Sequence, residues 1–238
     1  MLGLQAEALA DFEQAAAAAP DSSFTHFFVG QENLFLAEAA AGEAASAFDA
    51  AAEAAFKRAP DNARAQIGLG SVHLLRAQRQ LNDLLDSGLS GDDKKAALDS
   101  VIAEAEQALA LYEGVVAGGS QIETYGVPVD LYASYGAAIS QRLLGEVAFE
   151  QRKPGPAEQL IDEAESRLTA IMPLLESVAD FRLHAQVYQA LGSTYEWQSA
   201  FSGIDEDAAG RDEATQNARD AYTRCLAVGD AFPLILMW

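Results

Sequence analysis

Three histidines and one cysteine are the side chains best suited to chemistry in this chain, and their spacing does not favour catalysis. None of His26, His73 and His184 has a second His or a Cys at the spacing of a zinc motif, and His-Glu-x-x-His is absent. The chain also lacks the Gly-x-Ser-x-Gly nucleophile turn and the glycine-rich phosphate loop. We therefore expect a protein that is not an enzyme and that holds no metal and no cofactor.

An acidic stretch, DEDAAGRDE, has the beginning of a calcium-binding loop. Asp205, Asp207 and Gly210 match the D-x-D-x-x-G start, in which carboxylate oxygens ligate the ion. Ala209 supplies no ligand, and Gln216 stands where the closing bidentate Glu belongs. The sequence favours a solvated acidic loop that caps the following helix.

The single cysteine and the start of the chain bear on the compartment. Cys225 cannot form an internal disulfide, which fits a reducing environment, and its small-residue position predicts an inert buried thiol. Glu7 and Asp11 interrupt a start that has no early Lys or Arg, so it does not read as a secretory signal. No run approaches the roughly 20 apolar residues of a membrane helix. We expect a cytoplasmic protein without membrane insertion.

The charge of the chain restricts its partners. With 36 acidic and 15 basic residues, the formal net charge is −21. Such a surface repels phosphate backbones, which argues against nucleic acid and anionic membranes. A protein or peptide of basic character is electrostatically favoured, although the acidic residues can also simply keep an Ala-rich chain in solution.

Apolar residues recur at spacings of three and four along almost the whole chain, which indicates amphipathic helices. Pro and Gly clusters separate these stretches, and no stretch alternates with the period of two that a strand requires. The expected helices cover residues 5–18, 24–40, 44–58, 63–85, 93–116, 129–151, 157–171, 178–201 and 212–228. We predict an all-α protein without a sheet.

A glycine recurs inside four of these helices, each time between larger residues, as in YQALGSTY. The four are Gly30, Gly70, Gly136 and Gly192. A glycine inside a helix costs about 1 kcal/mol relative to alanine. Its repetition therefore requires a packing reason.

A second pattern occupies helices that lie between those of the first. It reads A-x-x-x-F-x-x-A-x-x-x-x-P at residues 8–20 and A-x-x-x-Y-x-x-C at residues 218–225. At residues 48–60 it reads F-x-x-x-A-x-x-A-x-x-x-x-P, with Phe and Ala exchanged. The two patterns alternate along the chain.

This alternation resembles the tetratricopeptide repeat over nearly the whole chain. The resemblance implies one array, 1–238, a right-handed α-solenoid of about five antiparallel helix pairs, in which glycine lets the first helix of a pair approach the second closely. Successive motif glycines lie 40, 66 and 56 residues apart, whereas the family repeats every 34 or so residues, so the array is irregular. Counted by consecutive helices, the pairs cover roughly residues 1–40, 41–86, 87–151, 152–201 and 202–238.

The resemblance further implies a concave groove, lined by the first helix of each pair, that holds a segment of another protein. By position in the repeat, the residues facing it are Phe24, Phe27, Gln31, Phe35, Arg64, Ile67, Ser71, Leu75, Asp130, Ala133, Ala137, Gln141, Gln186, Gln189, Ser193 and Trp197. Aromatic residues among them are as much candidates for the core as for binding. Family members that clamp a terminal carboxylate use Lys, Arg and Asn in these places, and this chain has Arg64 nearly alone. We expect a non-catalytic interaction or scaffold module of a different specificity.

Two alternatives remain open, and both concern the ends of the chain. The apolar tail FPLILMW reads like the start of a further first helix, so copies could join head to tail through Leu234, Ile235, Leu236 and Trp238. A further alternative is that the chain is the regulatory repeat array of a larger protein. A simple end cap is the third explanation of the same residues.

Overall fold

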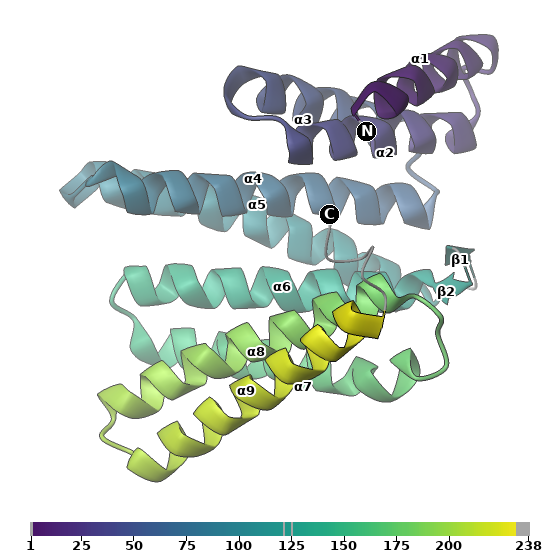
Figure 1. Ribbon diagram of the computed structural model, residues 1–238. Helices are drawn as coiled ribbons and strands as arrows, with labels where there is room; N and C mark the ends of the chain where they lie inside the picture. The colour runs from purple at the N-terminus through teal and green to yellow at the C-terminus, as the bar shows by residue number, and fades with distance from the viewer. Residues whose placement is uncertain (1, 121, 125, 232–238) are drawn as a thin grey trace. The chain divides into compact units, whose positions relative to one another are not determined.

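A computed structural model describes residues 2–120, 122–124 and 126–231 (Figure 1). The chain divides into two compact units, Met1–Ile122 and Glu123–Trp238, called unit 1 and unit 2 below. Helices form nearly all of the described residues, so the prediction of an all-α protein is confirmed.

In unit 1, each helix packs on the next one along the chain, and α2 also packs on α4. Its elements are α1 (Leu2–Ala18), α2 (Ser23–Ala39), α3 (Gly42–Lys57), α4 (Ala63–Ser87) and α5 (Gly91–Gly118). Polar side chains fix where two of them begin. Ser22 Oγ accepts from the Thr25 amide at 3.4 Å, and Asn62 Oδ1 accepts from the Arg64 amide at 3.0 Å.

Unit 2 repeats this arrangement, with each helix on its successor and α6 also on α8 (Figure 1). Its helices are α6 (Val129–Glu150), α7 (Pro154–Leu175), α8 (Phe181–Ile204) and α9 (Ala208–Ala231). Asp180 Oδ1 accepts from the Leu183 amide at 3.0 Å and caps the start of α8. In both units, therefore, alternate helices contact one another, as first helices do in a repeat array.

A small hairpin precedes α6, and the prediction of a chain without strands is wrong at this point. Strand β1 (Glu123–Thr124) pairs with β2 (Val127–Pro128) in antiparallel register. Gly126 has a φ of +79° in the turn, a conformation that glycine adopts without strain. Two-residue strands are too short to show an alternating pattern, which is why the sequence does not reveal them.

The glycines inside the helices mark points where a neighbouring ring touches the backbone. A Cβ added at Gly192 of α8 would lie 2.5 Å from the Tyr222 ring of α9. One added at Gly30 of α2 would lie 2.5 Å from the Phe56 ring of α3. These approaches are too close for any side chain at the two glycines, so close helix packing overrides the lower helix propensity of glycine.

The partner helices share one pattern: a small residue, a large residue four positions later and another small residue three positions after that. In α3 and directly after it these are Ala52, Phe56 and Ala59, all fully buried. The predicted register for this segment, with its Phe at position 48, is therefore displaced, and Phe and Ala are not exchanged. The same spacing recurs as Ala157, Ile161 and Ala164 in α7 and as Ala218, Tyr222 and Cys225 in α9, and in α5 as Ala108, Tyr112 and Val115, with the larger Val in the last place.

Gly145 of α6 meets the partner helix α7, and it lies nine residues after the predicted Gly136. A Cβ at Gly145 would lie 3.0 Å from the Ile161 side chain and 3.1 Å from the Ala157 carbonyl oxygen, both on α7. Since an α-helix turns by about 100° per residue, nine residues rotate the contact to the opposite side of the helix. The predicted binding side of α6 rotates with it.

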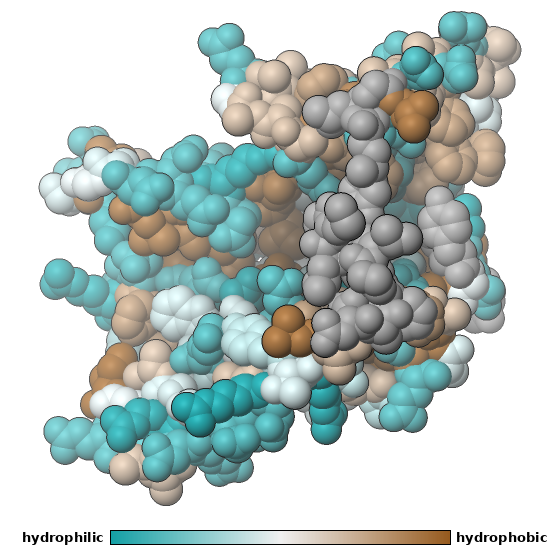
Figure 2. Space-filling model, viewed as in Figure 1, coloured by the Kyte–Doolittle hydropathy of each residue, from teal (hydrophilic) through white to brown (hydrophobic). Residues whose placement is uncertain are grey.

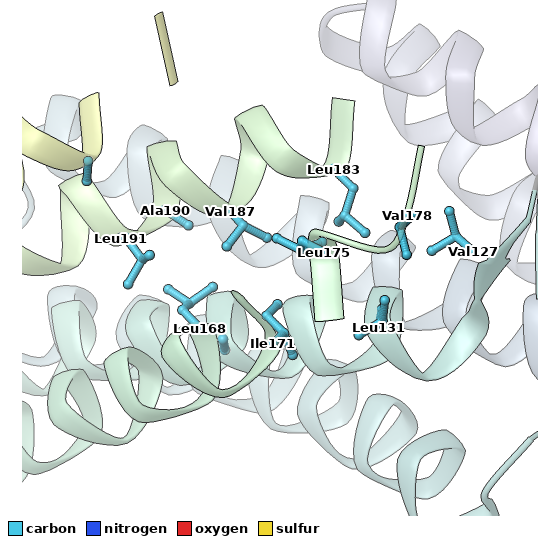
Figure 3. Packing of buried hydrophobic residues seen from close by; sticks show 12 residues of the cluster. Val127, Leu131, Leu168, Ile171, Leu175, Val178, Leu183, Val187, Ala190 and Leu191 are labelled. Carbon is cyan, nitrogen blue, oxygen red and sulfur yellow. The ribbon is translucent and has the colours of Figure 1, made fainter. Parts of the chain in front are cut away.

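Apolar clusters hold each unit together. In unit 2, Leu168 and Ile171 of α7 face Val187 and Leu191 of α8, and all four are buried (Figure 3). In unit 1, the fully buried Phe56 lies at the centre of a cluster built by α2, α3 and α4. Within each unit the core is made of local clusters, as expected where each helix contacts near neighbours in sequence.

Candidate functional site

In unit 1, the predicted binding residues are partly exposed along α2 and α4, with two exceptions. Phe24 is 59% exposed, whereas Phe27 is 7% exposed and belongs to the core. The partly exposed residues are Gln31, Phe35, Arg64, Ile67, Ser71 and Leu75. The hydroxyl of Ser71 lies 3.0 Å from the Tyr112 hydroxyl of α5, so it helps to hold that ring on α4.

Phe24 is the exposed end of a row of aromatic rings. Its ring meets that of Phe28 edge-on, with centroids 4.7 Å apart. Phe28 also contacts Phe27 at 5.0 Å, and Phe27 contacts the buried Phe56 at 6.3 Å. The edge-on contact with Phe28 favours one orientation of the Phe24 ring, while most of that side chain stays exposed.

On α6, the predicted binding residues lie largely inside the protein. Ala133 and Ala137 are fully buried, and Asp130 is partly exposed. Gln141 is 5% exposed, and its amide nitrogen donates to Glu163 of α7 at 3.0 Å. Gly136 and Gly145 lie on opposite sides of α6. The predicted positions, which were counted from Gly136, therefore point away from α8, and this explains why most of them are buried.

The same half-turn directs other residues of α6 toward α8. Arg142 Nη1 donates to Glu146 Oε1 at 2.5 Å and to Ser193 Oγ of α8 at 2.9 Å. The indole of Trp197 on α8 also donates to Glu146. We call the surface formed by Arg142, Glu146, Phe149, Ser193 and Trp197 the α6–α8 face.

Buried charge sets the electrostatics of the α6–α8 face. Burial raises the pKa of the Glu146 carboxyl, and the Arg142 charge and the hydrogen bonds from Trp197 and Arg142 oppose this rise. Burial also raises the pKa of Tyr135 to about 12, against the opposing charges of Arg142 and Arg182. Nε of Arg142 is buried without a hydrogen-bond partner. The Arg142 guanidinium therefore forms hydrogen bonds through Nη1, whereas its Nε is buried and forms none.

Aromatic rings extend the α6–α8 face beyond its charged part. The Phe149 ring of α6 meets the Trp197 ring of α8 edge-on at 5.3 Å. Both contact Phe201, which is 3% exposed, at 5.8 and 5.9 Å respectively. Trp197 and Phe149 are partly exposed. On the same helix as Trp197, Gln189 is exposed and Gln186 is partly exposed.

Two cavities lie on other parts of the units. One in unit 2, of about 300 Å³, lies among α7, α8 and α9 and is lined by Glu158, Asp162, Glu165 and Glu213 together with Tyr195 and Phe201. One in unit 1, of about 450 Å³, lies among α1, α2 and α3, and five of its eleven lining residues are alanines. Neither is lined by the predicted binding residues. In the view of Figure 2, hydrophilic residues lie along much of α9.

Each of the three histidines forms a hydrogen bond within its own unit. His26 donates to the Pro20 carbonyl oxygen, His73 to the Glu104 carboxylate and His184 to the Leu175 carbonyl oxygen, each at 2.7 Å. His26 and His73 are 3% and 6% exposed, in agreement with the prediction that they are packing residues.

The Cys225 thiol and the acidic loop are the other groups that the sequence singled out for chemistry. Burial raises the pKa of the Cys225 thiol, which is partly exposed rather than fully buried as predicted. In the acidic loop, Asp207 Oδ1 accepts from the Gly210 amide at 3.1 Å, which is the predicted cap of the next helix. Within the described residues, no three His, Cys, Asp or Glu side chains are arranged to hold a metal.

The predicted self-association residues, Leu234, Ile235, Leu236 and Trp238, lie outside the described residues. Among the helices that the structure does describe, none is both long and apolar enough to cross a bilayer. Comparisons with protein-family models, with curated proteins and with solved structures found no match for this chain.

Proposed function

We propose that this chain is a non-catalytic interaction module of the tetratricopeptide type, which binds a segment of another protein on its first helices. Two patterns support the family: glycines that meet large residues of a partner helix, and the repeated small-large-small spacing of those partners. The right-handed superhelix that the family implies is part of this proposal. A cytoplasmic location is also proposed, on the basis of the single cysteine.

The observation that carries the binding function is the exposure of rigidly held aromatic rings on first helices. Phe24 of α2 is 59% exposed yet fixed by ring contacts, and Trp197 of α8 is partly exposed yet fixed by Phe149 and Glu146. A rigid, partly exposed aromatic side chain offers large contact area at little entropic cost. Such residues frequently dominate the binding energy of interfaces.

Selection from a displayed library of random peptides tests this function. We expect the immobilised protein to enrich peptides whose binding is lost in Trp197→Ala or in Phe24→Ala. Truncation of such an anchor costs about 2 kcal/mol or more, which is roughly thirtyfold in Kd. Leu226→Ala is the matched control, because Leu226 of α9 is also 59% exposed but lies on a partner helix.

Two results would count against the function. One is a selection that enriches no peptide over an unrelated immobilised protein. The other is a set of enriched peptides that bind Trp197→Ala and Phe24→Ala as tightly as they bind Leu226→Ala.

A further inference from the structure

The cavity among α1, α2 and α3 in unit 1 combines small apolar residues with buried polar ones. Alanines of α1 and α3 form much of its lining. Two polar side chains of α2, His26 and Asn33, also line it, and each is only 3% exposed. Glu13 of α1 and Arg58, directly after α3, are exposed lining residues of opposite charge. The cavity therefore favours a ligand without net charge that is largely apolar and forms hydrogen bonds.

Each of the two buried polar side chains has an acceptor atom without a partner. His26 Nε2 donates to the Pro20 carbonyl oxygen at 2.7 Å, and Asn33 Nδ2 donates to the Val29 carbonyl oxygen at 2.8 Å. A neutral imidazole that donates through one nitrogen accepts at the other, and the amide oxygen of Asn33 is also an acceptor. Among the described residues, neither of these two acceptors has a hydrogen-bond partner, and neither is closed off from solvent. A ligand with a hydrogen-bond donor would pair an acceptor that the protein leaves unpaired.

Unit 2 contains a helix pair that can be compared with this one residue by residue. Gly192 of α8 meets the Tyr222 ring of α9, as Gly30 of α2 meets the Phe56 ring of α3. The two glycines therefore give α2 and α8 a common register, and the two rings give one to α3 and α9.

In this register, two tyrosines of α8 stand where α2 has its buried polar residues. Four residues before the glycine, Tyr188 corresponds to His26, and three residues after it, Tyr195 corresponds to Asn33. Tyr195 packs against the apolar cluster of unit 2. The side chain of Asn33 has no ring, so the cavity of unit 1 has room where unit 2 holds a phenol ring.

An arginine accompanies these places in both units. Arg224 follows Tyr222 by two residues, and Arg58 follows Phe56 by two residues. The guanidinium carbon of Arg224 lies 5.9 Å from the centroid of the Tyr188 ring, a distance at which a cation attracts the face of a ring. Because Arg58 lines the cavity, an aromatic ring bound there has the same kind of partner.

We propose that the cavity among α1, α2 and α3 binds an uncharged aromatic ring that carries a hydrogen-bond donor, as a phenol does. The hydroxyl donates to Asn33 or His26, the ring packs among the alanines, and Arg58 meets its face. A volume of about 450 Å³ lies within the range of small-molecule sites. The site is separate from the proposed binding function, because none of the predicted binding residues lines the cavity. A free phenol and a Tyr side chain of a partner share this chemistry, and the test distinguishes the two.

Two matched small molecules test the inference on the full chain. The probe is para-cresol, and its control is para-methylanisole, which has the same ring but cannot donate a hydrogen bond. Each is titrated into isotope-labelled protein while the amide chemical shifts are followed. We expect para-cresol to shift amides of α1, α2 and α3 and to bind about fivefold or more tightly than para-methylanisole, since the latter leaves a buried acceptor unpaired.

Two variants fill the cavity from different helices. Asn33→Tyr gives α2 the residue that α8 has at this place, and Ala54→Leu enlarges an exposed lining residue of α3. We expect each variant to weaken the binding of para-cresol about tenfold or more. Ala47→Leu is the matched control, because Ala47 is an exposed alanine of α3 that does not line the cavity. Ala54→Leu keeps the test decisive where Asn33→Tyr fails to fold.

A short end-blocked peptide with a single Tyr identifies the source of the ring. Tighter binding of this peptide than of para-cresol supports the inference with a Tyr of a partner protein as the ligand, and binding of para-cresol alone supports it with a free phenol. Equal binding of para-cresol and para-methylanisole would overturn the inference. So would binding that Ala54→Leu leaves as tight as Ala47→Leu does, shifts confined to helices other than α1, α2 and α3, or no binding of either the peptide or para-cresol at millimolar concentration.

Discussion

Phe56 is the residue on which the packing of unit 1 depends most. Its ring is fully buried, and it touches the backbone of α2 at Gly30 and that of α4 at Gly68. Contact on two sides leaves the ring no room to move away from an added atom. A glycine here is a steric requirement, although the local helix would be more stable with alanine.

Gly30→Ala should therefore destabilise the protein, while Gly114→Ala should not. A methyl group at Gly30 overpacks a core that cannot adjust, at a cost of about 1–3 kcal/mol. Gly114 lies inside α5 with nothing within 4 Å of an added Cβ, so alanine there should stabilise by up to about 1 kcal/mol. Urea unfolding of both variants measures the two changes. Equal effects would show that the glycine pattern does not report close packing.

A polar clamp joins three helices of unit 1. Arg79 of α4 donates to the Asp49 carboxylate of α3 at 2.6 Å and to the Ala37 carbonyl oxygen of α2 at 2.5 Å. Asp49 is 3% exposed, and burial raises the pKa of its carboxyl against the opposing charges of Arg79 and Arg76. Arg79 therefore compensates the buried charge of Asp49, and it also satisfies a carbonyl oxygen near the C-terminal end of α2.

Removing one partner of this clamp should cost more than removing both. Arg79→Met leaves Asp49 buried without its ion pair, at a cost of about 3 kcal/mol or more. The double variant Arg79→Met, Asp49→Leu should recover much of that loss, because no charge then stays buried. A double-mutant cycle by denaturant unfolding measures this coupling. Additive losses would contradict the account.

The helices themselves could be predicted from the sequence, because apolar periodicity and Pro or Gly breakers act locally. The register of α6 could not. Gly136 and Gly145 lie in the same helix, and the contact of Gly145 with Ile161 of α7 depends on tertiary packing that the local sequence does not show. On α8 the predicted Ser193 and Trp197 lie on the α6–α8 face, whereas on α6 the residues of this face, Arg142, Glu146 and Phe149, were not among those predicted. The repeated A-x-x-x-[large]-x-x-[small] spacing of α7 was the signal that could have found them.

At the scale of the whole molecule, the proposed function assigns packing and binding to different helices. The partner helices α3, α5, α7 and α9 carry the small-large-small sets that pack on the first helices. The first helices carry the exposed Phe24 and the α6–α8 face. Each unit contains both kinds of helix, so binding should not require either unit to unfold.

The most direct test of this assignment is hydrogen exchange of the full chain with and without a peptide selected from the library. The account predicts slower exchange along α2 and α4, or along α6 and α8, and unchanged exchange along α7 and α9. Protection confined to α7 and α9, around the acidic cavity, would contradict the claim that the first helices form the binding surface.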